Sequence, residues 1–153
     1  MRKTEPVSGL ETHLGYWLRM VSNHVSHAFK LKVEAHGVTV AEWVVMRQLL
    51  ETGETHPSEL AESLGITRGA ISKLVERLVA KGHVLRSAAE GDKRYQRVKL
   101  AAPGRKLVPA LATLADENDA EFFGHLSRGE AATLTEMLKG IVRLRGLKGV
   151  PVE

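Results

Sequence analysis

A stretch of about ten residues after Gly65 combines small, polar and basic side chains at helical spacing. Arg and Lys bond to phosphates and to base edges, and Ser and Thr hydroxyls bond to either kind of group. Bulky apolar groups are missing from the face that these side chains would share, so a DNA groove could approach it closely. The face comprises Thr67, Arg68, Gly69, Ser72, Lys73, Glu76 and Arg77. Its chemistry is that of a major-groove reader, although an ordinary solvated helix face would have a similar composition.

Basic residues are concentrated in one third of the chain. Residues 66–106 hold eleven Lys or Arg and three acidic residues, a net charge of +8, whereas the other 112 residues carry −4. A protein with one strongly basic third usually presents it to a polyanion, which favours a nucleic acid as partner. The whole chain has 153 residues, of which 43% are hydrophobic, and this fits a single globular domain.

Several classes of protein are disfavoured. The chain contains no cysteine, which excludes disulfides, a thiolate nucleophile and Cys-ligated zinc. Gly-x-Ser-x-Gly, His-Glu-x-x-His, Walker and Gly-x-Gly-x-x-Gly motifs are absent, so we do not expect an enzyme. No apolar run approaches the roughly 18–20 residues of a membrane helix. The first residues lack the apolar stretch of a signal peptide. We therefore expect a cytoplasmic protein without membrane contact.

The elements that must position the basic face are mostly helices. Ser8-Gly9-Leu10-Glu11 fits a capping box and predicts a long first helix that ends near Ala35–Gly37. Thr39-Val40-Ala41-Glu42 is a second capping box, and the helix that it opens is expected to reach about Glu51.

Two short helices joined by a tight turn follow. Pro57 suits the first turn of a helix over 57–64, Gly65 permits a left-handed turn, and Thr67 is a good N-cap for a helix that runs to Lys81. Apolar and small residues at helical spacing would pack inward and hold the pair together: Leu60, Ala61, Leu64, Ile66, Ile71, Leu74 and Leu78. This is the pattern of a helix-turn-helix.

The periodicity then changes to that of a β-hairpin. Residues 83–87 and 95–100 alternate in the β manner, and residues 88–94 between them are charged and rich in turn formers. Helices resume at Pro103, with Pro109 in a first turn or at a kink, and Ser127-Arg128-Gly129-Glu130 is a third capping box. The fold class is mainly α with a small β-hairpin wing, a winged helix-turn-helix core between N- and C-terminal helices.

In order and spacing, these motifs resemble the MarR family of transcriptional regulators over residues 10–145. The resemblance rests on the segments Gly37–Trp43, Ser58–Ile66, Arg68–Leu78, Lys81-Gly82, Asp92–Arg94, Val98–Leu100 and Gly104. It implies a single MarR-like domain over 1–153, with a winged helix-turn-helix region at 38–101 and dimerisation helices at 8–36 and 103–146.

The family resemblance also implies a homodimer that binds pseudo-palindromic double-stranded DNA, usually as a repressor. Its wing motif matches Asp92 and Arg94, which flank Lys93. In the family the arginine enters the minor groove and the aspartate helps to hold the wing. A guanidinium suits the negative potential of a narrow A·T-rich groove. The apolar stripes on the first and last helices independently favour a dimer, because one short chain cannot easily cover them.

Members of the family commonly respond to small aromatic or anionic effectors, which predicts such a ligand here and no other cofactor. His13, Tyr16, Trp17 and Arg19 on the first helix combine rings with one cation and are candidates for its pocket, although Trp17 also suits a dimer core. His24 and His27 share a helix face without a third ligand, so we expect no metal site.

Two alternatives to a sequence-specific regulator remain at this stage. A winged helix can serve as a protein-interaction module, whose partner binding would not depend on the basic side chains. A non-specific DNA binder would bind all duplexes alike, with a steep dependence on salt.

Overall fold

The computed structural model describes residues 6–89 and 92–152, and of residues 88, 89 and 92–95 it describes the backbone alone. A short 3-10 helix, η1 (Leu10–Thr12), precedes the long helix α1 (Leu14–Glu34). The remaining elements follow in the order α2 (Val40–Thr52), α3 (Pro57–Leu64), α4 (Arg68–Ala80), β1 (Val84–Ala89), β2 (Asp92–Leu100), α5 (Ala102–Phe123) and α6 (Arg128–Arg145).

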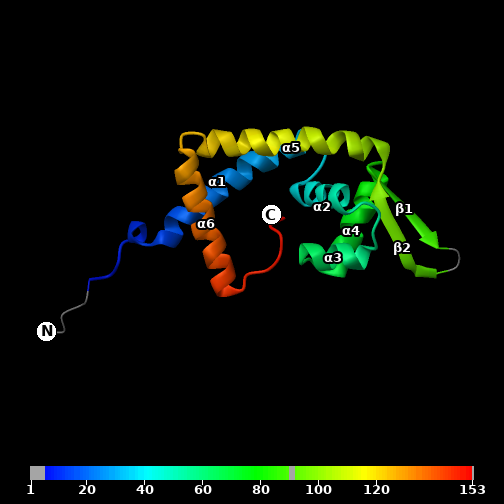
Figure 1. Cartoon of the computed structure of the whole chain (residues 1–153), viewed down its shortest axis with the longest axis horizontal. Helices are drawn as coiled ribbons and strands as arrows, with labels where there is room; N and C mark the ends of the chain where they lie inside the picture. Colours follow the sequence, from blue (N-terminus) through cyan, green and yellow to red (C-terminus); the bar gives the residue numbers. More distant parts are fainter. Residues whose placement is uncertain (1–5, 90–91, 153) are drawn as a thin grey trace.

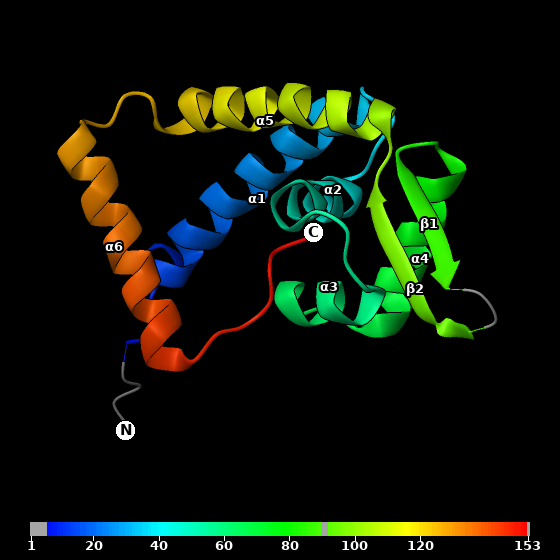
Figure 2. The same cartoon turned by 45° about the vertical axis from the view of Figure 1, so that its right-hand side comes forward.

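The short helices and α6 occupy opposite ends of an elongated molecule, and α5 runs between the two ends (Figure 1). Helix α5 runs along one side and α1 packs beneath it, while α2, α3, α4 and the hairpin gather at the far end. Helix α6 turns away from the end of α5 and stands apart from the short helices (Figure 2). The C-terminal segment then crosses back from α6 toward α2 and α3.

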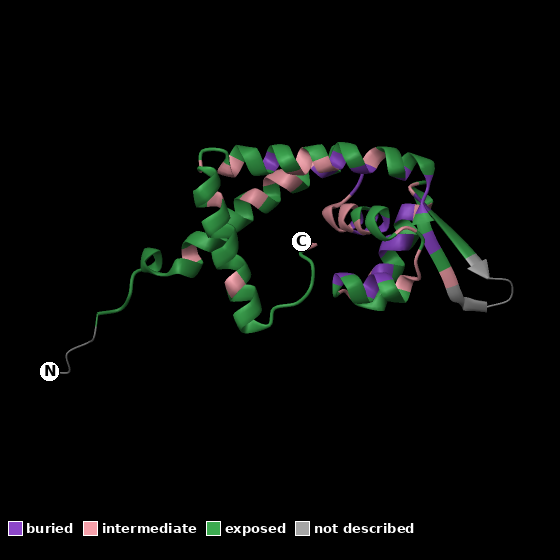
Figure 3. Cartoon of the chain, viewed as in Figure 1, coloured by how far each residue is buried: buried purple, intermediate pink, exposed green. Residues whose placement is uncertain are grey.

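The hydrophobic core lies among the short helices and the part of α5 beside them (Figure 3). Most of the residues expected to hold the helix pair are buried, with Ile71 and Leu78 fully enclosed, while Ile66 is half-buried. Helix α3 ends at Leu64 as expected, because Gly65 adopts the left-handed conformation with φ 64°. The helix-turn-helix predicted from the sequence is therefore present: α3 has its predicted bounds, and α4 ends at Ala80, one residue before the predicted end.

The hairpin is longer than predicted and has an additional backbone partner. The backbone of β1 extends to Ala89 and that of β2 begins at Asp92, so much of the expected link belongs to the strands. Val84 pairs with Leu100 and Arg86 with Val98 in antiparallel register. Thr55, just before α3, exchanges two backbone hydrogen bonds with Val98, of 3.0 and 2.8 Å. The wing is thereby attached to the start of the helix-turn-helix.

The prediction of a capping box at Ser8 was wrong. Ser8 does not cap a helix: η1 begins after Gly9, and α1 begins only at Leu14, with no side-chain cap at His13. The indole N–H of Trp17 donates to the Glu11 carbonyl oxygen at 2.9 Å and satisfies part of this irregular start instead. Local sequence could not reveal a partner six residues away.

Helices α5 and α6 differ in how closely they follow the sequence pattern. Pro109 lies inside α5, well past its first turn. Helix α6 begins with a complete capping box, in which Ser127 Oγ accepts from the Glu130 N–H and the Glu130 carboxylate accepts from the Ser127 N–H. Apolar side chains on α1 and α6 remain exposed, including Trp17 at 47% and Ile141 at 46%. The described part of the chain leaves these two faces without apolar cover.

Candidate nucleic-acid interface

The predicted reading face on α4 is open to solvent. Arg68, Gly69, Ser72, Lys73 and Arg77 are all exposed, as is Thr67 at the N-cap. A side chain built on Gly69 would meet no atom within 4 Å, so the N-terminal half of this face is free of steric obstruction. The opposite face of α4 is buried through Ile71, Leu74, Val75 and Leu78. The helix is therefore held from behind and presents its polar side outward.

The start of α4 is fixed by its own cap. Thr67 Oγ1 accepts a hydrogen bond from the Ala70 N–H at 3.1 Å. This bond satisfies one of the free N–H groups of the first helical turn. Since the hydroxyl of Thr67 already accepts this bond, its remaining capacity toward a phosphate is mainly as a donor.

A buried ion pair joins the end of α4 to the start of α2. The Lys81 ammonium donates to both carboxylate oxygens of Glu42, at 2.9 and 2.8 Å, and to the Gly37 carbonyl at 2.9 Å. The Glu42 side chain is 1% exposed, whereas that of Lys81 is 36% exposed. The Thr39 hydroxyl caps α2 as predicted. The carboxylate of Glu42 bonds to Lys81. Its place in the capping motif had instead predicted a bond to the backbone at the start of α2.

The wing contributes further basic residues beside α3. Arg97 lies 4.0 Å from Glu54, and Lys99 is exposed on β2. His56 Nδ1 lies 3.1 Å from the Gln96 carbonyl and ties the wing to the start of α3. The side chains of Asp92, Lys93 and Arg94 lie outside the described residues, so their predicted roles stay predictions.

One acidic group near the wing is held in its charged form. Thr55 Oγ1 donates to Glu59 at 2.7 Å, and this bond is the main reason that the pKa of the Glu59 carboxyl lies below its ordinary value. A hydrogen bond from the His56 backbone and the charges of His56 and Arg97 act in the same direction. The Glu59 carboxyl therefore stays ionised to lower pH than an ordinary glutamate, close to Arg97 of the wing.

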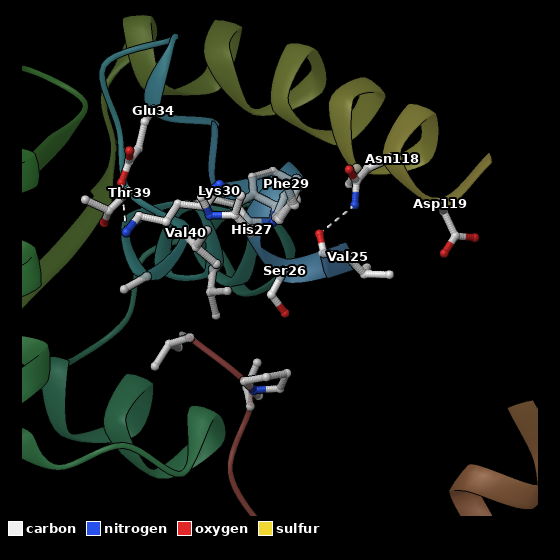
Figure 4. Close-up of a pocket in the computed structure, with 17 residues that line it drawn as sticks. Val25, Ser26, His27, Phe29, Lys30, Glu34, Thr39, Val40, Asn118 and Asp119 are labelled. Carbon is white, nitrogen blue, oxygen red and sulfur yellow. Dashed lines mark hydrogen bonds and ion pairs between the residues drawn. The ribbon is translucent and has the colours of Figure 1, made fainter. Parts of the chain in front are cut away.

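A cavity of about 710 Å³ lies between α1, α2, α5 and the C-terminal segment. Its apolar wall includes Phe29, Val40 and Trp43, and its polar groups include His27 and Lys30 (Figure 4). Lys30 lies 3.9 Å from Glu34. The C-terminal residues Val150, Pro151 and Val152 close one side.

The α1–α5 boundary of this cavity is pinned by a buried amide. Asn118, 3% exposed, donates through Nδ2 to the Val25 carbonyl at 3.1 Å. Its Oδ1 accepts from the Lys32 ammonium at 3.0 Å, and Lys32 also bonds to Glu121. Glu121 lies in an acidic run of α5, and its side chain stays 57% exposed. Its contact with Lys32 joins residues 89 positions apart in the chain, which no local pattern could reveal.

The candidate effector residues lie elsewhere. His13, Tyr16 and Arg19 line a shallow groove on α1, together with His24. Trp17 instead packs edge-on against Tyr16, with ring centroids 5.1 Å apart. The structure therefore does not bring these four residues to the larger cavity.

The described residues include neither a membrane-spanning helix nor a metal-binding cluster. Within residues 6–89 and 92–152, no helix combines the length and apolar character needed to cross a membrane. The same ranges hold no group of three or more His, Asp or Glu side chains placed to bind a metal ion, and His24 and His27 gain no third ligand there.

Comparison with known proteins agrees with this geometry. Residues 36–94, which include the helix-turn-helix and most of the wing, match the model of the MarR family. The chain is 27% identical to the multiple antibiotic resistance protein MarR of Escherichia coli K12, over 93% of this chain and 99% of that protein.

Solved structures extend the likeness to nearly the whole chain. A cysteine-to-serine mutant of E. coli MarR in complex with operator DNA superposes with a TM-score of 0.74 at 28% identity, covering 84% of this chain and 93% of that one. BpsR of Bordetella bronchiseptica, whose DNA binding is regulated by 6-hydroxynicotinic acid, superposes with a TM-score of 0.75 at 23% identity, covering 90% of this chain and 97% of that one. The second likeness bears on the fold alone.

Proposed function

Because the chain belongs to the MarR family of transcriptional regulators, we propose that it acts as a homodimer on a pseudo-palindromic DNA operator, as a repressor that a small effector relieves. The observation that carries this proposal is the face of α4, which is exposed, small and basic outside and fully packed inside. A helix of this kind can enter a major groove without disturbing the core that holds it.

Each DNA-binding residue has a proposed role. Arg68, Ser72 and Lys73 serve base edges or phosphates in the major groove, together with Thr67 and Arg77. Gly69 keeps the groove side of α4 low enough for close approach. Arg94 enters the minor groove, with Asp92 and Lys93 beside it on the wing.

The exposed apolar faces of α1 and α6 are proposed to meet the same faces of a second copy. They contain Leu14, Trp17, Leu18, Val21, Leu134, Met137, Leu138 and Ile141. Two-fold symmetry would place two α4 helices on one side of the dimer, which suits two half-sites about one turn of DNA apart. Residues 8–36 and 103–146 thus form the proposed dimerisation region, and residues 38–101 the DNA-binding region.

Selection of bound duplexes from a random pool, at near-physiological salt, tests this function. We expect enrichment of a pseudo-palindrome whose half-sites lie about one helical turn apart. A folded protein that enriches no sequence would favour a protein-interaction module or an effector-dependent binder, and selection repeated with aromatic acids would separate these two. Binding of all duplexes alike, with steep salt dependence, would identify a non-specific binder.

Two substitutions then test the residue roles on the selected operator. Arg94→Ala should weaken specific binding by about 1–3 kcal/mol, the scale of one good groove contact. Ser72→Ala should change the preferred sequence more than the salt dependence, because its hydroxyl is assigned to a base edge. Exposed Arg47, which pairs with Glu51 on α2, provides a control through Arg47→Ala. Equal binding by all three variants would remove Arg94 and Ser72 from the interface.

We propose the cavity between α1 and α2 as the effector site, with Phe29 and Trp43 against an aromatic ring and Lys30 or His27 near an anionic group. The α1 groove with His13, Tyr16 and Arg19, beside Trp17, is the second candidate. Isothermal titration with 6-hydroxynicotinic acid should separate them, because Lys30→Ala weakens binding in the first case and Arg19→Ala in the second.

A further inference from the structure

The C-terminal segment links two parts of the molecule that the long helices otherwise keep apart. Helix α6 ends at Arg145, where Gly146 is left-handed with φ 62° and the Leu147 N–H bonds to the Val142 carbonyl at 3.0 Å. From this fixed exit the chain crosses to the short helices and ends beside α2 and α3 (Figure 2). We call residues 149–152 of this segment the strap.

The strap is attached at the turn of the helix-turn-helix. The Val150 N–H donates to the Leu64 carbonyl at 2.9 Å, and Leu64 is the last residue of α3. Gly149 lies so close to Gly65 that a Cβ built on Gly65 would stand 2.7 Å from the Gly149 Cα. The approach itself requires a glycine at position 65, whereas Gly149 is favoured by its left-handed φ of 94°. The turn that the strap touches leads directly into α4.

The strap is also a wall of the proposed effector cavity. Val150, Pro151 and Val152 line it opposite Val40 and Trp43 of α2 and the side chains of α1. In Figure 4 the strap, drawn as the red ribbon, passes beneath Val40 and Ser26. A molecule in this cavity would therefore contact the strap and α2 at once.

We propose that the strap couples the cavity to the reading helix: an occupant packs against Val150, Pro151 and Val152, holds the strap on Leu64 and Gly65, and thereby restrains the turn before α4. The inference rests on the proposed effector site. It requires only that the occupant favour the docked strap over the released one, since a ligand shifts an equilibrium by its differential affinity for the two states. By reciprocity, a released strap must weaken binding of the occupant.

A matched pair of substitutions at Val150 separates the strap's backbone bond from its side chain. Val150→Pro removes the N–H that donates to Leu64. Val150→Thr keeps this N–H and a β-branched side chain of similar shape, and is the control. A chain that ends after Lys148 lacks the strap. It is a second form without the docked strap, and it controls for any other effect of proline on the backbone near position 150.

The test uses hydrogen exchange of the full chain, with the anionic aromatic dye 1-anilinonaphthalene-8-sulfonate as cavity probe. The N–H groups of Gly65 and Ile66, which bond to Glu62 and Ala61 at the end of α3, should exchange severalfold faster in Val150→Pro and in the shortened chain than in Val150→Thr. Saturating dye should slow this exchange in the wild type and in Val150→Thr only.

Dye affinity provides the reciprocal measurement. Fluorescence titration should show binding to the cavity severalfold weaker in Val150→Pro and in the shortened chain than in Val150→Thr. Dye bound to the exposed apolar faces of α1 and α6 contributes equally to all variants. Equal exchange and equal dye affinity across the variants would overturn the coupling. Neither readout needs DNA, so failure of the duplex selection would refute the proposed function without deciding this inference.

Discussion

Glu42 is the residue whose environment differs most from that of an ordinary surface carboxylate. Its side chain is 1% exposed and accepts two hydrogen bonds from Lys81, which joins the first turn of α2 to the end of α4. A buried charge that loses its partner retains its desolvation penalty. The pair therefore matters for the position of α4 as well as for stability.

Glu42→Gln should lower the free energy of unfolding by about 1–3 kcal/mol. This is below the range of a fully buried broken pair, because Lys81 reaches solvent. Urea unfolding of the variant measures the change. Glu51→Gln is the matched control, since its partner Arg47 is exposed and such pairs contribute about 0–1 kcal/mol. Equal destabilisation by the two substitutions would contradict the special role of Glu42.

Glu130 gives the capping box of α6 a pH dependence. Hydrogen bonds from the backbone and hydroxyl of Ser127 hold the pKa of its carboxyl below the ordinary value of 4.5. A lowered folded pKa means that the stabilisation is present above the unfolded pKa and is lost as pH falls through the folded one. Glu130→Gln should therefore be less stable than the wild type at pH 7, and the difference should be smaller at about pH 3. Urea midpoints at both values test this, and an equal gap at both would exclude the carboxylate as its source.

At the scale of elements, the sequence was most informative where one short segment determines the structure. The bounds of α3, the left-handed Gly65 and the caps at Thr67 and Ser127 all follow from residues within a few positions of one another. The Ser8 motif has the same local form, but Ser8 does not cap a helix. The difference is that α2, α4 and α6 continue directly from their caps, whereas the indole of Trp17 bonds to the Glu11 carbonyl just ahead of α1.

Contacts between distant elements could not be predicted in this way. The bridge from Thr55 to Val98, the Asn118 bonds to α1 and the cavity proposed as the effector site all depend on how distant segments pack together. The sequence predicted a ligand pocket on α1 because aromatic side chains and an arginine occur there. It could not show which face of α1 packs against α2. Residue types in the sequence predicted aromatic and basic groups for a ligand site. The tertiary arrangement determines which of these groups line a cavity.

Gly65→Ala tests the tight turn between α3 and α4. A non-glycine residue at this left-handed φ is destabilised by about 1–2 kcal/mol, and a Cβ there would also meet Gly149. In a chain that ends after Lys148 the second effect disappears, so the substitution should be less harmful there. Thermal unfolding of the four proteins measures both parts. An identical loss of stability in the full and shortened chains would mean that the strap moves away from a Cβ at position 65 without a cost in free energy.

At the scale of the whole molecule, charge and apolar surface are segregated. The basic residues of 66–106 lie mostly on the helix-turn-helix, the wing and the start of α5, and most of the exposed large apolar residues lie on α1 and α6. One end thus suits a polyanion and the other a second apolar surface. This separation lets two copies associate without covering either reading helix.

Leu138→Lys should convert the proposed dimer to a monomer. Leu138 lies in the middle of the α6 stripe with Leu134 and Ile141, and a buried lysine in a symmetric interface would place two unpaired charges near one another. Analytical ultracentrifugation measures the mass, and operator binding should weaken together with dimer loss, because one half-site contributes only part of the affinity. Glu136→Lys, on the opposite face of α6, introduces the same side chain in solvent and should leave the mass unchanged. A Leu138→Lys protein that remains dimeric would show that the copies associate through another surface, and the half-site spacing found by duplex selection would then have to be explained from that surface.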